Sequence, residues 1–212
     1  MTLELSYRWD MDFDLMKHVS TIPICSNTLF IYRLDIKEDL ALKFAKEKFR
    51  RTQGHGAFLL SEDFNILKKY KELNKEINKA VDVTLKKILM LENINYRIFN
   101  SWLTKTKPKV FADSHFHTNS WLSGVYYPKS DPGFRINFFN DTMTQFFTPP
   151  TEYNMFNARD WIITPKDNFL ILFFSQLRHQ ILLNTSNQNR FSLAFNILPK
   201  GEFGADDSKT IF

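Results

Sequence analysis

Cysteine, glycine and long apolar runs are all scarce in this 212-residue sequence, and each scarcity excludes a class of protein. The single cysteine, Cys25, excludes an intramolecular disulfide and any zinc site built from several thiolates, and it favours a reducing, intracellular location. Only six glycines are present, and the sequence contains neither a P-loop nor a dinucleotide-binding glycine pattern. No apolar run approaches the roughly 18 residues that a transmembrane helix needs.

The chain also lacks the layout of a secretory signal peptide, in which basic residues precede an apolar stretch. Its first residues are instead acidic at Glu4, Asp10, Asp12 and Asp14. These absences predict a soluble, cytoplasmic protein with no membrane partner. What the sequence has in excess is aromatic residues, since 22 phenylalanines bring the aromatic share to 16%, and this favours a strand-rich core.

Positive charge is concentrated between residues 36 and 109, where 17 Lys and Arg residues accompany 9 Asp and Glu residues. The first 35 residues have a net charge of −2 and the last 103 have a net charge of −1. A basic helical segment can bind nucleic acid or another acidic partner. The acidic residues are interspersed among the lysines, however, which favours the solvated outer face of a helix over a nucleic-acid partner.

Two helices are predicted in this basic portion, which extends from about residue 36 to 92. The first is expected over 37–51 and the second over 61–92. The second has apolar residues at a three-to-four-residue period, with Lys, Glu and Asn between them. Its stripe consists of Leu67, Tyr70, Leu73, Ile77, Val81, Leu85 and Ile88. We expect this stripe to pack across one face of a sheet.

Short strands separated by turn signals make up most of the rest of the chain. They are expected at 28–34, 96–103, 108–117, 120–127, 133–140, 158–164, 169–174, 179–184 and 190–197. Many short strands preceded by helices predict an α+β fold, a double-sheet jelly roll with the N-terminal helices packed on one sheet. We expect a single domain over 1–212, with the jelly-roll core at about 96–200. The unpatterned stretch 141–157 is expected to be a flexible loop near a site.

Two of the five histidines, His115 and His117, lie two positions apart in a segment of strand-forming residues. Side chains at i and i+2 of a strand point to the same face, roughly 6.7 Å apart, so two imidazoles can converge on one metal ion. Taken alone, such a pair is more often an ordinary pair of core or surface histidines.

A second group of residues, near the C-terminus, favours a metal site over an ordinary pair of histidines. His179 follows a buried apolar run, and the strand that begins at Arg190 separates its side chains by size. One face carries Arg190, Ser192, Ala194 and Asn196, and the other carries Phe191, Leu193, Phe195 and Ile197. An Arg and a hydroxyl two positions apart on the less bulky face suit a bidentate grip on a carboxylate. Three ligands on one side of a metal are typical of non-haem Fe(II) sites.

Three sequence blocks together resemble the 2-oxoglutarate/Fe(II)-dependent oxygenases, and in particular a group of these proteins found in bacteria and tailed phages. The blocks are H-x-H-x-N-S-x-x-S-G-V-Y-Y at 115–127, F-x-S-x-x-x-H at 173–179 and R-x-S-x-x-F-N at 190–196. The resemblance covers about residues 101–212 and does not reach the basic helices. If a phage encodes the protein, the expected location is the host cytoplasm.

The resemblance implies a double-stranded β-helix, Fe(II) as the metal and 2-oxoglutarate as a cosubstrate. It implies that His115 and His179 occupy the two usual histidine ligand positions. It also implies that Arg190 and Ser192 hold the distal carboxylate of 2-oxoglutarate. Further groups implied near the cosubstrate are Tyr126 or Tyr127 and Asn119, the last of which can alternatively shape the turn.

One position departs from the superfamily pattern. Most members have H-x-D, whereas here His117 stands where the carboxylate is expected. Asp113 lies a further two residues back on the same predicted face, and it is the alternative ligand or an acceptor for an imidazole N–H. The spacing to the following turn favours His117.

The expected function is therefore that of a dioxygenase that uses Fe(II), 2-oxoglutarate and O2 to hydroxylate a substrate, with release of succinate and CO2. The alternatives are a cupin-like metal-dependent dioxygenase that does not use 2-oxoglutarate, and a non-catalytic jelly-roll binding protein. The motifs do not specify the substrate.

Overall fold

The structure is a computed structural model that describes residues 27–52, 57–91, 94–141, 148, 151–154, 157–204 and 206–211. The glycines that flank His55, and most of the predicted loop 141–157, lie outside these ranges. None of the helices in the described part of the chain is both long and apolar enough to cross a membrane.

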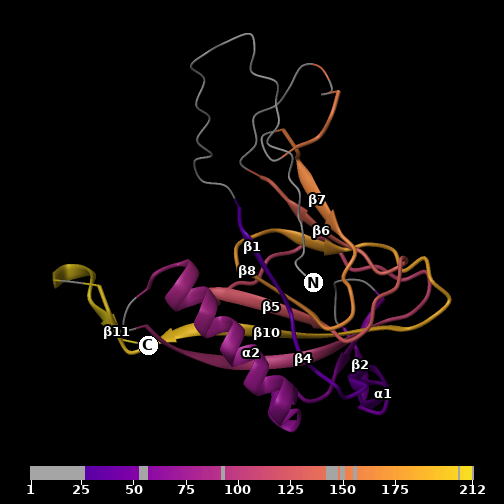
Figure 1. The fold of residues 1–212 in the computed structure, drawn as a ribbon, viewed down its shortest axis with the longest axis horizontal. Helices are drawn as coiled ribbons and strands as arrows, with labels where there is room; N and C mark the ends of the chain where they lie inside the picture. The colour runs from indigo at the N-terminus through magenta and orange to yellow at the C-terminus, as the bar shows by residue number, and fades with distance from the viewer. Residues whose placement is uncertain are drawn as a thin grey trace.

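The main element is a seven-stranded sheet in which every pair of neighbouring strands is antiparallel (Figure 1). Its order is β1 (Leu29–Arg33), β8 (Phe169–Phe174), β5 (Leu122–Tyr127), β10 (Arg190–Lys200), β4 (Asn95–Thr106), β3 (Leu59–Ser61) and β2 (Phe49–Arg51). A three-stranded antiparallel sheet has the order β7 (Asp160–Ile163), β6 (Ile136–Phe139) and β9 (His179–Ile181). A small hairpin pairs β11 (Glu202–Phe203) with β12 (Thr210–Ile211).

The helices lie mainly in the N-terminal half, and α2 crosses one face of the main sheet (Figure 1). They are α1 (Leu40–Phe44), the 3-10 turn η1 (Ile66–Lys69), α2 (Lys71–Val83) and the π turn η2 (Thr84–Ile88), with a second 3-10 turn, η3 (Asp206–Ser208), near the C-terminus. The predicted α+β double-stranded β-helix, with N-terminal helices packed on one sheet, is confirmed.

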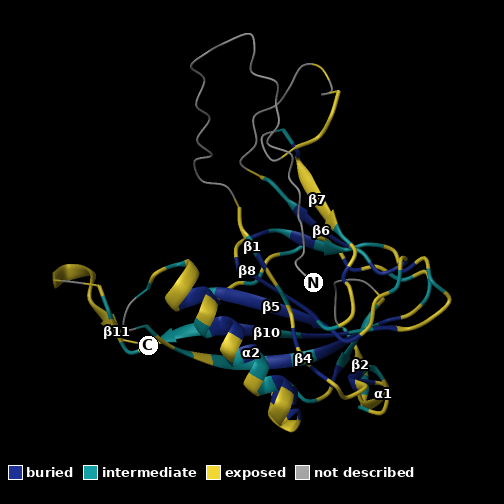
Figure 2. Ribbon diagram, viewed as in Figure 1, coloured by how far each residue is buried: buried dark blue, intermediate teal, exposed yellow. Residues whose placement is uncertain are grey.

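Near the middle of the main sheet, β5 is buried at every position and β8 at every position except Phe174 (Figure 2). On β8, Leu170 and Leu172 join the cluster beneath α2, whereas Ile171 and Phe173 join a second cluster with Phe138 of the small sheet. This alternation follows from the two-residue period of a strand. The functional residues described below lie on the face that packs against the small sheet.

The prediction for the second helix was right in its stripe and wrong at both ends. Six of its seven apolar residues are buried, but Ile88 is exposed. A π turn, closed by a hydrogen bond from Leu89 N to Thr84 O, inserts an extra residue and so turns Ile88 off the stripe. At the other end, Ser61 belongs to β3, because it pairs with Phe49 of β2.

Two further predictions were wrong. The helix expected over 37–51 is confined to α1, and its last part forms β2 because Phe49–Arg51 pairs with β3. The strand expected over 108–117 is not a regular strand, and it contains only isolated bridge residues, Ala112 and His115, of which His115 pairs with His179. In β2, long-range pairing with β3 overrides the local preference for a helix.

Candidate metal centre

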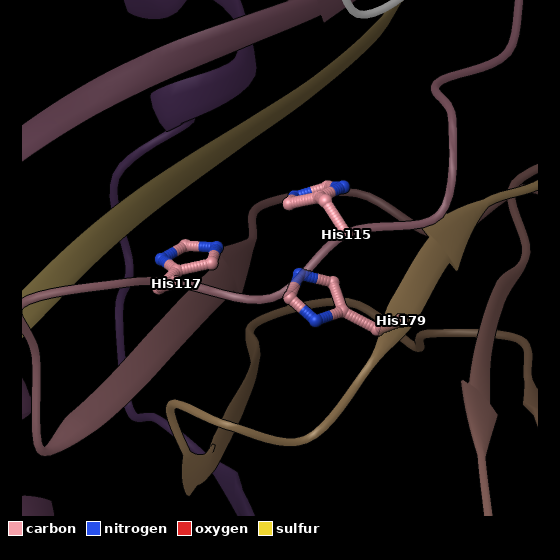
Figure 3. Close-up of side chains that lie close together, drawn as sticks. All are labelled: His115, His117 and His179. Carbon is pink, nitrogen blue, oxygen red and sulfur yellow. The ribbon is translucent and has the colours of Figure 1, made fainter. Parts of the chain in front are cut away.

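Three histidines from two separate segments meet at one edge of the small sheet (Figure 3). His179 begins β9, and His115 pairs with it through two backbone hydrogen bonds, 2.9 Å from His115 N to His179 O and 2.8 Å in the reverse direction. The ring centres of His115 and His179 lie 4.4 Å apart, and that of His117 lies 5.5 and 5.2 Å from them. Each ring offers one nitrogen, and these nitrogens lie within 4.8 Å of one another.

The other nitrogen of each ring already has an oxygen partner. Nδ1 of His115 lies 2.8 Å from the carbonyl oxygen of Asp113, and Nδ1 of His179 lies 2.9 Å from that of Leu177. Nδ1 of His117 lies 2.6 Å from Oδ1 of Asn196. An oxygen acceptor assigns the imidazole hydrogen to Nδ1 and leaves the Nε2 lone pair free for a metal. The donor set is thus three imidazoles, each held in orientation by a hydrogen bond at Nδ1.

Burial keeps two of these rings uncharged. It lowers the pKa of His117 to about 4, an effect that the hydrogen bond to Asn196 partly opposes. It lowers the pKa of His179 to about 3, and the neighbouring His115 adds to that effect. Both rings are therefore deprotonated at neutral pH, as metal binding requires.

Aromatic side chains surround the histidines. The Phe173 ring centre lies 4.8 Å from that of His179, and Phe138 lies 5.9 Å from the same ring. Trp102 on β4 lies 5.7 Å from His117. These rings fix the imidazoles by packing and restrict water, which strengthens electrostatic interactions at the site.

Asp113, the alternative ligand, contributes differently from the three histidines. Its side chain is exposed, and its carboxylate is not part of the group whose ligand atoms converge. Its backbone carbonyl instead receives the His115 hydrogen bond.

Arg190, at the start of β10, is only 1% exposed, yet none of its three guanidinium nitrogens has a hydrogen-bond partner among the described residues. Its guanidinium carbon lies 4.9 Å from the ring centre of Tyr127. The Tyr127 hydroxyl is also buried without a described partner, and so is Oγ1 of Thr106. Thr106 lies directly opposite Arg190 in the β4–β10 register. Ser192 is buried two residues further along β10.

Buried polar groups are seldom left unpaired, and an unpaired buried cation is especially costly. This corner therefore combines a guanidinium and two hydroxyls that have no hydrogen-bond partner in the described part of the chain. Such a donor set fits a carboxylate, which has only acceptor atoms. The three imidazoles and this corner together fit a divalent metal and a carboxylate-bearing molecule.

The remaining predicted residues lie elsewhere. Tyr126 faces the helix-side cluster, where its hydroxyl donates to Asn168 Oδ1 at 2.6 Å, so the structure does not bring it to the Arg190 face. Asn119 is exposed in a turn with a φ of +56°, a conformation that Asn tolerates well. The structure therefore fits Asn119 to the turn-shaping alternative.

No role in the site was predicted from the sequence for Thr106, Trp102 or Asn196. Asn196 was visible on the small-residue face of its strand, and the final letter of the third motif block is its signal. Thr106 and Trp102 carry no local signal, because only the register of β4 against β10 brings them to this face.

Known proteins resemble this chain in sequence and in fold. Residues 100–196 match the family described as "Putative 2OG-Fe(II) oxygenase". The matched segment, a little under half of the chain, is similar to the 2OG-Fe(II) oxygenases. This match confirms the resemblance in the motifs, and it indicates an oxidoreductase that uses Fe(II) and 2-oxoglutarate. The match spans all three histidines and the Arg190–Ser192 pair. No curated protein matches the sequence.

Solved structures of other oxygenases share the fold. A prolyl-4-hydroxylase from Pseudomonas putida has a TM-score of 0.55 at 13% identity, with 82% of this chain and 94% of that chain covered. A prolyl hydroxylase from Trichoplax adhaerens, in complex with a hypoxia inducible factor peptide, has a TM-score of 0.57 at 11% identity, with 81% and 84% covered. HygX from Streptomyces hygroscopicus, with nickel, 2-oxoglutarate and hygromycin B bound, has a TM-score of 0.57 at 7% identity, with 81% and 83% covered. At these identities the likeness establishes the fold.

Proposed function

We propose that this oxygenase hydroxylates a substrate with Fe(II), 2-oxoglutarate and O2, and that His115, His117 and His179 hold the metal. The observation that carries the proposal is the coexistence of two features on one side of the main sheet. Three imidazoles offer nitrogens within 4.8 Å of one another, and a buried Arg190 has no described partner for its guanidinium nitrogens. A metal site alone would not require a buried arginine without a described partner.

When bound, Fe(II) and 2-oxoglutarate supply the oxidising power that places one oxygen atom of O2 in the substrate and the other in succinate, with loss of CO2. Arg190 binds the distal carboxylate of 2-oxoglutarate through charge-assisted hydrogen bonds. The Ser192 hydroxyl binds the same carboxylate. The hydroxyls of Tyr127 and Thr106, which lack described partners, complete the set of donors around the carboxylate.

His117 is the third ligand in this proposal, in preference to Asp113. Its ring has one nitrogen within the convergent group, whereas the Asp113 side chain is exposed. A site of three neutral imidazoles carries one positive charge more than the usual pair of histidines with a carboxylate. It should therefore discriminate less sharply in favour of Fe(II) over other divalent metals that accept imidazole.

Succinate formation tests this function directly. Anaerobically loaded Fe(II) protein is expected to convert 2-oxoglutarate slowly to succinate once O2 is admitted, even without added substrate. His179→Ala should abolish this O2-dependent succinate, because it removes a ligand that β9 holds rigidly. Full activity in that variant would show the proposed metal site to be wrong.

A cupin-like dioxygenase without 2-oxoglutarate is the second candidate, since it also uses three histidines. The two candidates differ in whether 2-oxoglutarate binds. In the presence of Mn(II), a saturating cosubstrate stabilises the folded protein by RT ln(1 + [L]/Kd), about 2.7 kcal/mol at 100 times Kd. A rise in Tm on adding 2-oxoglutarate supports the first candidate, and no rise at any concentration supports the second.

A further inference from the structure

His117 is held in place differently from the other two histidines. His115 and His179 fix each other through paired backbone hydrogen bonds, and β9 continues directly from His179. His117 lies outside every strand, and its backbone is tied by one bond, from its N–H to the carbonyl oxygen of Ser175 at 2.9 Å. The orientation of its ring therefore depends on side chains.

Those side chains form a buried polar chain behind the ring. Oδ1 of Asn196 accepts from Nδ1 of His117 at 2.6 Å and from the Ser123 hydroxyl at 2.8 Å. Oγ of Ser123 lies 2.8 Å from Oγ of Ser175, which lies 2.9 Å from Oγ of Ser120. All of these residues except His117 are at most 9% exposed.

The chain gathers residues from four segments around one imidazole. Ser123 comes from β5 and Asn196 from β10, while Ser175 follows β8 and Ser120 precedes β5. These four belong to the sequence blocks that resemble the oxygenase family, yet metal and cosubstrate binding leave them without a role. A buried polar network of this kind is costly unless every member is satisfied, and a satisfied one orients its members uniquely.

The orientation of the Asn196 amide decides which nitrogen of His117 is free. With Oδ1 toward the ring, as here, His117 carries its hydrogen on Nδ1, and the Nε2 lone pair is available. With the amide nitrogen toward the ring, Nδ1 would accept and the hydrogen would move to Nε2, which would block the metal. The Ser123 hydroxyl, donating to the same Oδ1, favours the first orientation.

We propose that Asn196, held by Ser123, is a positioning residue that selects the metal-binding tautomer of His117. This inference rests on the proposed function only in that His117 is a metal ligand. The proposal explains how a third imidazole can stand in place of a carboxylate. Nε2 of His117 takes the place of the carboxylate oxygen, and Nδ1 of the same ring is held by the amide oxygen of Asn196.

Two variants of Asn196 separate hydrogen bonding from packing. Asn196→Leu keeps a similar volume but removes the acceptor, and it is expected to weaken metal binding by about 10- to 100-fold, the usual effect of losing such a partner. Asn196→Asp supplies another oxygen acceptor and should bind metal at least as tightly as the wild type. Ser123→Ala removes one of the two donors to Oδ1, and we expect a loss of several-fold.

Co(II) serves as the probe, because its visible absorption reports binding without O2 chemistry. Each variant is titrated with Co(II) alone, and the tautomer of each imidazole is read from long-range ¹H–¹⁵N correlations in the metal-free protein. Ser61→Ala is the matched control, since Ser61 is 1% exposed and its hydroxyl bonds to backbone groups of Asp63 and Leu103 and not to the polar chain behind His117. That control should lose stability and keep the wild-type Co(II) affinity.

The expected result is Nδ1–H on His117 in the wild type and Asn196→Asp, and a mixture or Nε2–H in Asn196→Leu with the weakened Co(II) affinity. Wild-type affinity in Asn196→Leu would overturn the proposal. If Asn196→Leu does not fold, Ser123→Ala decides, and wild-type affinity together with an unchanged tautomer would overturn it. His117→Ala tests the ligand assignment separately from the role of Asn196. If this variant binds Co(II) like the wild type, His117 is not a metal ligand.

Discussion

The guanidinium of Arg190 lies 4.9 Å from the centre of the Tyr127 ring, and both side chains are almost completely buried. The ring face offers the cation a favourable quadrupole but no hydrogen-bond acceptor. Burial lowers the pKa of Arg190 and raises the pKa of Tyr127, so the phenol stays protonated and can donate. The contact between the two groups opposes both shifts, but neither group has another described polar partner, and a bound carboxylate would supply one.

Arg190→Met should therefore affect stability and binding in opposite directions. An uncompensated buried charge is destabilising, so replacing it with an apolar side chain of similar volume is expected to be neutral or stabilising. We expect the Tm of the metal-free variant to match or exceed that of the wild type, while the rise in Tm caused by 2-oxoglutarate with Mn(II) disappears. A variant that is less stable but still responds to 2-oxoglutarate would contradict this assignment of Arg190.

The adjacent tyrosines provide a matched pair, because they lie on opposite faces of β5. Tyr127→Phe removes a hydroxyl that has no described partner, so stability should change by less than about 1 kcal/mol while 2-oxoglutarate binds several-fold more weakly. Tyr126→Phe removes the donor to Asn168 and should cost about 1 kcal/mol without altering 2-oxoglutarate affinity. Titrations followed by thermal denaturation measure both quantities, and equal effects on affinity would contradict the division of faces.

Features that depend on a single segment could be predicted from the periodicity of its sequence. The stripe of α2, the alternation along β10 and the apolar run of β8 each repeat at the period of their own element, so their buried faces could be predicted. The three histidines were found because they fall in recognisable blocks. The faces of β10 are as expected: Leu193, Phe195 and Ile197 lie in the helix-side core.

Features that depend on pairing between distant segments could not be predicted in this way. Thr106 reaches the Arg190 corner only through the β4–β10 register, across more than 80 positions of sequence. The segment 45–51 favours helix locally, but β3 recruits its end into the sheet. Likewise, a strand was expected around His115, whereas the structure has an isolated bridge between His115 and His179 there.

Asp113 provides a test of the ligand set that does not disturb the core. Its carboxylate is exposed and only its backbone carbonyl contacts His115, so Asp113→Ala should leave Co(II) affinity within about twofold of the wild type. The measurement is a Co(II) titration in parallel with His179→Ala, for which binding should be lost. A loss of tenfold or more in Asp113→Ala would make that carboxylate a ligand.

The two buried histidines should also make the metal-free protein sensitive to acid. In the unfolded chain a histidine takes up a proton near its ordinary pKa of 6.5, whereas in the folded state His117 does so only at about 4 and His179 at about 3. Between these values the unfolded state binds more protons, so the free energy of unfolding falls as the pH is lowered from 6.5 toward 3 and changes little from this source above 6.5.

Urea denaturation of the metal-free protein at a series of pH values measures this slope. His179→Gln removes one of the two groups, so its stability should depend less steeply on pH below 6.5, even if the variant is less stable at pH 7. Bound Co(II) should steepen the loss of stability in acid, because protons compete with the metal for the same Nε2 atoms. A pH dependence that is identical in the wild type and His179→Gln would mean that this ring is not held neutral by burial.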